Sequence, residues 1–154
     1  MRRIVAWKRR EETKPLLVLF AEREQLDALG VRAAASVLDR FFSLWPAPLT
    51  VVLPIAAPIP ASLGVATLAV RLPAHPELRD VLARSGPVTG TSLNRSGEPA
   101  CFDPDAAEAL AGGAIDLLVD GGTTPGGLAS TLVDATQDPP RLLRAGAFPW
   151  PAAR

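Results

Sequence analysis

L-L-V-L-F-A, residues 16–21, is an unbroken apolar run between Lys14-Pro15 and the charged triplet Glu22-Arg23-Glu24. A short apolar run with charged or proline borders is typical of a buried strand. The residues that follow predict a short helix over 23–29, ended by Gly30. A buried strand followed directly by a helix indicates a sheet with helices packed against it.

The same alternation continues along the chain. It predicts further strands over 49–53, 66–72, 87–91, 115–119, 131–134 and 141–144, and further helices over 31–42, 77–83 and 105–111. This order indicates an α/β or α+β fold around a central sheet. A length of 154 residues suits one domain. We expect that domain to span 1–147 and an irregular, proline-containing tail to follow over 148–154.

The overall charge is balanced, with 16 Lys plus Arg against 16 Asp plus Glu, so no global field attracts nucleic acid or a membrane. The start of the chain is nevertheless basic. Such a block can be a solvated face, a nucleic-acid patch or a phosphate site. No apolar run reaches the roughly 18 residues that would span a bilayer, so we expect no membrane partner.

Cysteine and histidine are each present once, as Cys101 and His75. An intrachain disulfide is therefore impossible, which fits a reducing compartment and a cytoplasmic location. A histidine-based triad or a multi-histidine metal site would have to be built around His75 alone. We expect no side-chain nucleophile and no metal site made of protein ligands.

Polar residues cluster beside four of the predicted strands. The cations Lys8, Arg10 and Lys14 could neutralise a triphosphate, or form a solvated basic turn. Thr67 and Arg71 lie four apart on one strand and so share a face. The other two clusters are the loop 89–99, with Ser92, Asn94 and Ser96, and the glycine-rich segment 121–131, with Ser130.

The last two clusters each have two interpretations. Hydroxyls, an amide and glycines in 89–99 suit a loop that holds an anion or a nucleotide, but the same residues are common in surface turns. The segment 121–131 matches neither G-x-x-x-x-G-K-[ST] nor G-x-G-x-x-G. It could allow close backbone approach to a ligand, or be a flexible surface loop.

Taken together, the order and spacing of these motifs resemble the YrdC-like threonylcarbamoyl-AMP synthase family (TsaC-type). The resemblance covers essentially the whole chain and rests on Lys8-x-Arg10-x-x-x-Lys14, Trp45-Pro46-Ala47-Pro48-Leu49-Thr50, Ala69-Val70-Arg71, Ser92-Leu93-Asn94, Ser130-Thr131-Leu132-Val133-Asp134 and Leu143-Arg144-Ala145-Gly146. It implies a twisted mixed sheet with flanking helices and a concave basic groove.

The activity that the resemblance implies is the condensation of L-threonine, bicarbonate and ATP, normally with Mg²⁺. The products would be threonylcarbamoyl-adenylate and pyrophosphate, which makes the enzyme a nucleotidyltransferase. The adenylate feeds the t⁶A modification at position 37 of tRNAs that read ANN codons, so t⁶A-pathway transferases would be partners. Carried over to this chain, the ATP contacts would be Lys8, Arg10, Lys14, Thr67, Ser92, Asn94 and Arg144, and the threonine contacts Arg71 and Ser130.

The chain also departs from the family pattern. Members usually carry a helix, a strand and P-T-[DE]-T-x-Y-G-L ahead of K-x-R, and this sequence has no such motif before Lys8. We therefore expect the first strand of the family sheet to be missing, through a start placed too late or a truncation. Leu93 replaces the usual Ala of S-A-N, and Gly90 stands where a hydroxyl or small residue is usual.

Three functions stay open on this basis. The first is an active synthase seen without its N-terminal segment. The second is a catalytically impaired member that binds nucleotide or double-stranded RNA or tRNA; for the chain as given we expect weak or no adenylate synthesis. The third is a module of a larger carbamoyltransferase, which the lack of flanking zinc-finger or acylphosphatase-like sequence disfavours.

Overall fold

The computed structural model describes residues 2–9 and 15–150, and its contacts divide the chain into two compact units. We call Met1–Lys14 with Thr91–Gly127 the helical unit, and Pro15–Gly90 with Leu128–Arg154 the sheet unit. The expectation of one domain over 1–147 stays a prediction.

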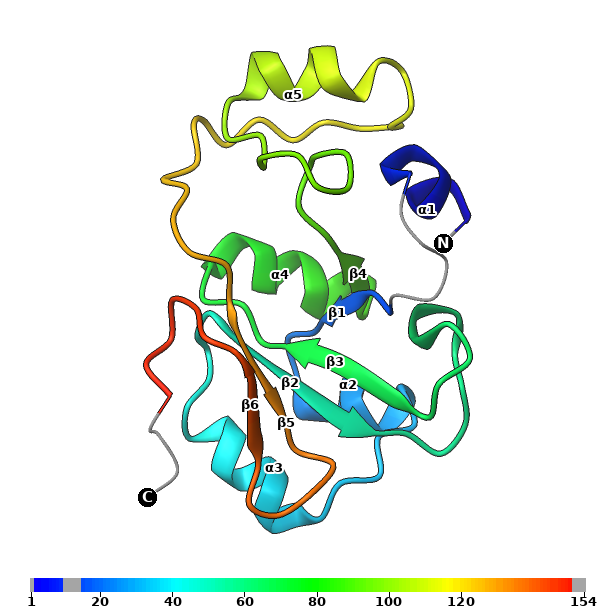
Figure 1. Cartoon of the computed structure of the whole chain (residues 1–154), viewed down its shortest axis with the longest axis vertical. Coiled ribbons are helices and arrows are strands. Elements are labelled where there is room, and N and C mark those ends of the chain that lie inside the picture. The colour runs from blue at the N-terminus through cyan, green and yellow to red at the C-terminus, as the bar shows by residue number, and fades with distance from the viewer. Residues whose placement is uncertain (1, 10–14, 151–154) are drawn as a thin grey trace. The chain divides into compact units, whose positions relative to one another are not determined.

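The sheet unit is built on a six-stranded mixed sheet with the strand order β4-β1-β3-β2-β5-β6 (Figure 1). Strand β1 runs parallel to β3 and β2 parallel to β5, whereas the other neighbours are antiparallel. This confirms the predicted mixed α/β sheet. The strands are β1 (Leu17–Leu19), β2 (Leu49–Pro54), β3 (Thr67–Arg71), β4 (Val88–Gly90), β5 (Thr131–Asp134) and β6 (Arg141–Arg144).

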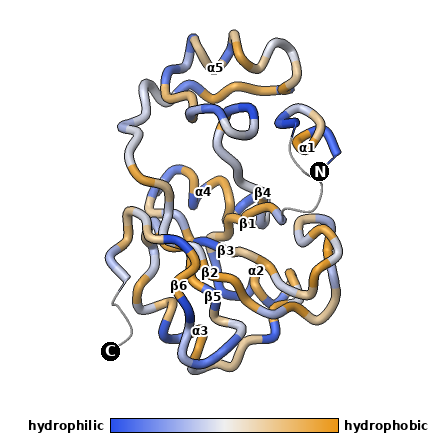
Figure 2. The backbone as a smooth tube through the Cα atoms, viewed as in Figure 1, coloured by the Kyte–Doolittle hydropathy of each residue, from blue (hydrophilic) through white to orange (hydrophobic). Residues whose placement is uncertain are grey.

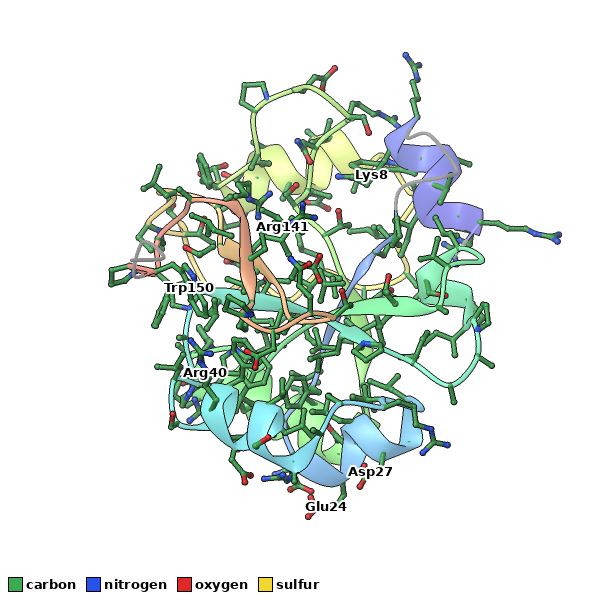
Figure 3. The ribbon with its side chains drawn as sticks, turned by 60° about the horizontal axis from the view of Figure 1, so that its bottom comes forward. Lys8, Glu24, Asp27, Arg40, Arg141 and Trp150 are labelled. Atoms are coloured by element: carbon green, nitrogen blue, oxygen red, sulfur yellow. The ribbon has the colours of Figure 1, made fainter. Side chains whose placement is uncertain are left out.

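Helices pack against one face of this sheet. They are α2 (Arg23–Ala28), α3 (Ala35–Phe42) and α4 (Pro76–Ser85). A short 3₁₀ turn, η1 (Pro60–Ser62), lies in the connection between β2 and β3. Helices α2 and α3 lie together on one side of the sheet (Figure 3), and Gln25 of α2 donates to Leu82 O of α4. Phe20 and Phe41 are fully buried in this core.

Strand alternation decides which residues face the helices. In β3, Leu68 and Val70 are buried, while Thr67, Ala69 and Arg71 are only half-buried. Because successive strand residues point to opposite faces, the second face is the less covered one. The polar residues that the sequence singled out in β3 therefore lie on that second face.

The helix predicted over 31–42 begins later than expected, at Ala35. Val31 instead forms an isolated antiparallel bridge with Ile55, and Arg32 N donates to Pro54 O at 2.8 Å. The apolar periodicity of 35–42 was a sound helix signal. The chain at Val31 and Arg32 instead pairs with the backbone at the end of β2. A local sequence pattern does not reveal this pairing.

The helical unit contains α1 (Arg2–Lys8) and α5 (Pro104–Ala111). The second was predicted, and its ends follow the expected signals. Asp103 Oδ1 accepts from Ala106 N at 2.9 Å, and Gly112 ends the helix with a φ of 52°. Helix α1 was not predicted, because its basic residues were interpreted only as a charge cluster.

The strand predicted over 115–119 is wrong. This apolar stretch after α5 (Figure 2) is irregular, and Leu117 and Val119 are 78% and 82% exposed. A strand needs a neighbour that pairs its backbone. Among the described residues, no strand pairs with this segment, so its apolar sequence alone does not make it extended sheet.

Within the described part of the chain, no helix has the length and apolar character needed to cross a membrane.

Candidate functional site

In the helical unit, the predicted S-x-N loop is built around a buried lysine. Lys8 ends α1 and is only 3% exposed. Its ammonium donates to Ser92 O at 2.7 Å, to Asn94 O at 2.9 Å and to Asn94 Oδ1 at 2.8 Å. A lysine ammonium has three N–H donors, and these oxygens supply three acceptors. Lys8, Ser92 and Asn94 are therefore brought together, with Lys8 as the centre of the loop.

The loop is further held by its own polar side chains. Ser92 Oγ donates to Asn94 Oδ1 at 2.7 Å, and Asn94 Nδ2 donates to Glu98 O at 2.6 Å. Ser96 N donates to Lys8 O at 2.9 Å. The loop is thus an ordered polar turn whose conformation depends on a cation. Ser92 itself stays exposed, so its hydroxyl can reach solvent or a ligand.

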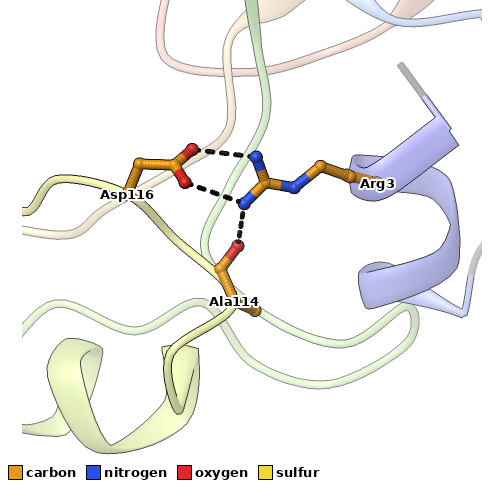
Figure 4. Close-up of polar contacts among 3 residues, drawn as sticks. All are labelled: Arg3, Ala114 and Asp116. Atoms are coloured by element: carbon orange, nitrogen blue, oxygen red, sulfur yellow. Dashed lines mark hydrogen bonds and ion pairs between the residues drawn. The ribbon is translucent and has the colours of Figure 1, made fainter.

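A cavity of about 380 Å³ lies beside this loop within the helical unit. Its lining comes from α1, from residues 91–93 and from residues 114–116. Arg3 binds Asp116 through two hydrogen bonds and donates to Ala114 O at 3.0 Å (Figure 4). The hydrogen bond and charge of Arg3 lower the pKa of Asp116. The cavity is large enough for a small molecule.

In the sheet unit, the notable cation is Arg71 at the end of β3. Its Nε is buried and finds no hydrogen-bond acceptor among the residues that the structure describes. Burial, and then the positive charge of Arg144, lower the pKa of Arg71. A half-buried guanidinium with an unused donor and a second guanidinium nearby is an arrangement that an anion would stabilise.

Ser130 and Arg144 form the other half of this cluster. Arg144 Nε and Nη2 donate to Ser130 O at 3.2 and 2.8 Å, and Nη2 lies 3.4 Å from Ser130 Oγ. The hydroxyl oxygens of Thr50 and Ser130 are 2.9 Å apart. The structure therefore groups Ser130 and Arg144 with Thr50, and Arg144 is near enough to Arg71 for its charge to lower the pKa of Arg71.

Among the described site residues, Thr67 is not part of either group. Thr67 shares a face with Arg71, as predicted, but it begins β3 while Arg71 ends it. At about 3.3 Å per residue, the two Cα atoms are about 13 Å apart. Arg10 and Lys14 lie outside the described residues.

The chemistry of the two groups differs. The cluster in the sheet unit fits a small carboxylate, because guanidinium groups bind carboxylate oxygens and the hydroxyls can hydrogen-bond a polar substituent. The loop in the helical unit presents Ser92 over a buried positive charge. In the described ranges, no group of three or more His, Cys, Asp or Glu side chains could hold a metal ion.

A family model described as "Telomere recombination" matches residues 1–146. The chain belongs to the Sua5/YciO/YrdC family. This confirms the resemblance on which the motifs were interpreted.

Curated members of the Sua5/YciO/YrdC family include proteins similar to this chain. It is 38% identical to the threonylcarbamoyl-AMP synthase of Pyrococcus abyssi, over 97% of this chain and 45% of that protein. It is 36% identical to the threonylcarbamoyl-AMP synthase of Bacillus subtilis, over 95% of this chain and 43% of that protein. The chain thus spans less than half the length of these two relatives. The expected loss of an N-terminal strand stays a prediction.

Solved structures of the family have the same fold. The crystal structure of P. abyssi Sua5 in complex with L-threonine matches with a TM-score of 0.86 and 34% identity, over 96% of this chain and 44% of that one. Escherichia coli YciO, at 22% identity, matches with a TM-score of 0.79 over 95% of this chain and 72% of its own, which supports the fold alone.

The structure adds Thr50 to the cluster around Ser130 and Arg144. Thr50 is 3% exposed, and its hydroxyl lies beside Ser130 Oγ. A signal was present in the sequence, because Thr50 is the one hydroxyl in the apolar strand L-T-V-V-L. Its partner is 80 residues away, so the pairing depends on β2 and β5 lying side by side.

Proposed function

We propose that this chain carries the substrate-binding machinery of an L-threonylcarbamoyladenylate synthase. The reaction would join L-threonine, bicarbonate and the adenylyl group of ATP and release pyrophosphate, for the t⁶A modification of tRNA. One observation carries the proposal. A cluster of Arg71, Ser130, Arg144 and Thr50 suited to a small hydroxy-carboxylate occurs in a chain similar to a protein crystallised with L-threonine.

In this proposal, Arg71 binds the threonine carboxylate. Its unused Nε–H donor and the proximity of Arg144 both favour a negatively charged partner, since each would be compensated by it. Ser130 hydrogen-bonds threonine through its hydroxyl, which Thr50 orients. Arg144 contacts the ATP phosphates, and its positive charge also favours the threonine carboxylate at Arg71.

The S-x-N loop would serve ATP. Ser92 and Asn94 contact the nucleotide, together with Arg10, Lys14 and Thr67. Lys8 supports them by holding the loop in place and by adding positive charge behind it. Negative charge builds up on phosphoryl oxygens during adenylyl transfer, and preplaced cations and N–H donors stabilise it. Positioning three substrates together supplies much of the remaining acceleration, so no side-chain nucleophile is needed.

Mg²⁺ remains an expectation of the family resemblance. The described residues offer no acidic or His/Cys cluster for a resident ion. The ion would therefore arrive as a complex with the triphosphate.

The central test is L-threonine binding by isothermal titration calorimetry. Arg71→Met should weaken binding at least tenfold, because it removes a charged hydrogen-bond donor worth about 1.5–3 kcal/mol. Arg84→Met is the matched control, since Arg84 is exposed on α4. Absence of threonine binding by the wild-type chain, or equal affinity in the two variants, would contradict the proposed site.

A second experiment separates synthesis from binding alone. An active synthase should release pyrophosphate only when both L-threonine and bicarbonate are present. A family member that only binds nucleotide would bind ATP without that release. Arg10→Ala should abolish ATP binding in either case, and unchanged nucleotide affinity would remove Arg10 from the site.

A further inference from the structure

The chain folds back on itself after β6, and this return segment, residues 146–150, runs beside the residues around Ser130. Ala147 N donates to Ala129 O at 2.9 Å. Thr131 Oγ1 donates to Phe148 O at 2.6 Å and accepts from Phe148 N at 3.1 Å. Three hydrogen bonds thus join the two stretches, one at Ala129 and two at Thr131, the residues on either side of Ser130.

Thr131 is the centre of this contact. It is fully buried, and its hydroxyl uses both its donor and its acceptor capacity on the backbone of Phe148. Its own N–H donates to Pro48 O at 2.9 Å, just before β2. The residue next to Ser130 is therefore held from two sides, by the start of β2 and by the return segment.

Gly146 shows how closely the segment approaches. A Cβ atom at this position would overlap Ala129 O, Ser130 C and Thr131 N, which are all backbone atoms. Backbone atoms cannot turn aside as a flexible side chain can. Only glycine allows the chain to pass over the Ser130 peptide at this distance.

The far end of the return segment is anchored in the core. The Trp150 ring stacks on the fully buried Phe41, with centroids 6.0 Å apart and an interplanar angle of 15°. The Arg40 guanidinium lies over the Trp150 ring, 5.7 Å from its centroid (Figure 3). An irregular segment with such an anchor is a defined structural element and not a loose end.

These contacts bear on the candidate site through Ser130 and Arg144. Arg144 lies two residues before Gly146 and donates twice to Ser130 O. Ser130 lies one residue before Thr131 and faces Thr50. Movement of the return segment would therefore displace both the hydroxyl and the guanidinium of the site.

We propose that the return segment positions the amino-acid site, with Thr131 and Gly146 as positioning residues for Ser130 and Arg144. The inference deepens the proposed function and rests on it for the identity of the ligand. Thr131 contacts no substrate in this scheme. It fixes the peptide from which Ser130 presents its hydroxyl and to which Arg144 binds.

The test compares Thr131→Val, which keeps the shape but loses the hydroxyl, with Thr131→Ser, which keeps the hydroxyl. The first readout is the side-chain Nε–H signal of Arg144 in nitrogen-15 NMR, which needs no ligand. In Thr131→Val, the Arg144 Nε–H should lose its protection from solvent exchange, because Ser130 O moves away. In Thr131→Ser, this protection should be retained. Equal protection in both variants would overturn the proposal.

The second readout is L-threonine affinity by calorimetry. We expect about a tenfold loss in Thr131→Val and less than a twofold change in Thr131→Ser. If the wild type binds no threonine, the proposed function fails, while the Arg144 signal still decides the positioning role. If Thr131→Val does not fold, Trp150→Ala decides: it should weaken affinity several-fold relative to Leu142→Ala, which trims an exposed side chain of β6. Equal affinity of those two variants would overturn the proposal.

Discussion

The two units of this chain bury very different kinds of side chain. The sheet unit is closed by large apolar residues with no exposure, such as Phe20, Phe41 and Leu49. In the helical unit one of the most buried side chains is a lysine, and Leu117 and Val119 are largely exposed. One unit follows the usual division of apolar inside and polar outside, and the other inverts it in part.

The difference indicates two sources of stability. Apolar burial is non-directional and tolerates small shifts of the elements. A buried ammonium depends on each oxygen that it contacts, because an unsatisfied partner in a dry environment is costly. We therefore expect the sheet unit to respond mainly to loss of volume, and the helical unit to loss of a single donor.

The largest expected effect is the loss of a core ring from the sheet unit. Phe41→Ala should lower the free energy of unfolding by about 3–5 kcal/mol, because it leaves a cavity beneath Trp45 and Trp150. Urea denaturation followed by tryptophan fluorescence measures this. Phe102→Ala in the helical unit is the matched control, since Phe102 is 45% exposed and should cost far less. Equal losses would remove the contrast between the units.

A smaller effect is expected at the buried cation of the helical unit. Lys8→Met keeps the length of the side chain but removes the ammonium that donates to three oxygens of the S-x-N loop, of which only Asn94 Oδ1 keeps a second donor, Ser92 Oγ. Local stability should fall by about 1–3 kcal/mol. Hydrogen exchange of the Cys101 amide, which donates to Leu93 O at 2.9 Å, reports on the loop.

Arg2→Met provides the control for that variant. Arg2 is exposed at the start of the same helix, so its loss should leave exchange in the loop unchanged. If Lys8→Met also leaves the Cys101 amide as protected as in the wild type, the lysine does not organise the loop.

The same contrast explains how much of the fold could be predicted from the sequence. Strands β1, β2, β3 and β5 are apolar runs with clear borders, and α5 has an N-cap in Asp103 and a terminating Gly112. Such signals are local. The segment 115–119 has an equally apolar sequence but no neighbouring strand within the described part of the helical unit, and pairing is a non-local property.

The candidate site divides in a similar way. The motifs containing Ser92, Asn94 and Arg71 could be picked out by residue type and order. The burial of Lys8 could not, because a basic run is usually solvated and only the folded loop supplies its three acceptors. The contact between Thr50 and Ser130 likewise depends on the register of β2 against β5.

A modest effect is expected from the turn between β5 and β6. The hydroxyl and backbone N–H of Thr136 lower the pKa of Asp134, with a smaller contribution from Arg141. A carboxyl with a lowered folded pKa stabilises the protein above its unfolded pKa of about 3.9, and this stability is lost as the pH falls through the folded pKa.

Asp134→Asn should therefore lower stability at pH 7 by about 0.5–1 kcal/mol and make less difference at pH 3. Urea midpoints at the two pH values measure this. Asp27→Asn is the control, because Asp27 is exposed on α2 (Figure 3) and should leave both midpoints unchanged. A loss for Asp134→Asn that is the same at both pH values would assign the effect to the turn geometry and not to the charge.

The smallest effect is expected at the ion pair of the helical unit. The side chains of Arg3 and Asp116 are 69% and 82% exposed, so water and salt screen their attraction. Arg3→Met should leave the urea midpoint unchanged and should only speed hydrogen exchange over 114–116 at low salt. In 1 M NaCl, where screening extends over about 3 Å, that difference should shrink. A difference that persists in high salt would mean that the hydrogen bond from Arg3 to Ala114 O, rather than the ion pair, holds this segment. The helical unit would then depend on directional bonds at its surface as well as at Lys8, which sharpens its contrast with the sheet unit.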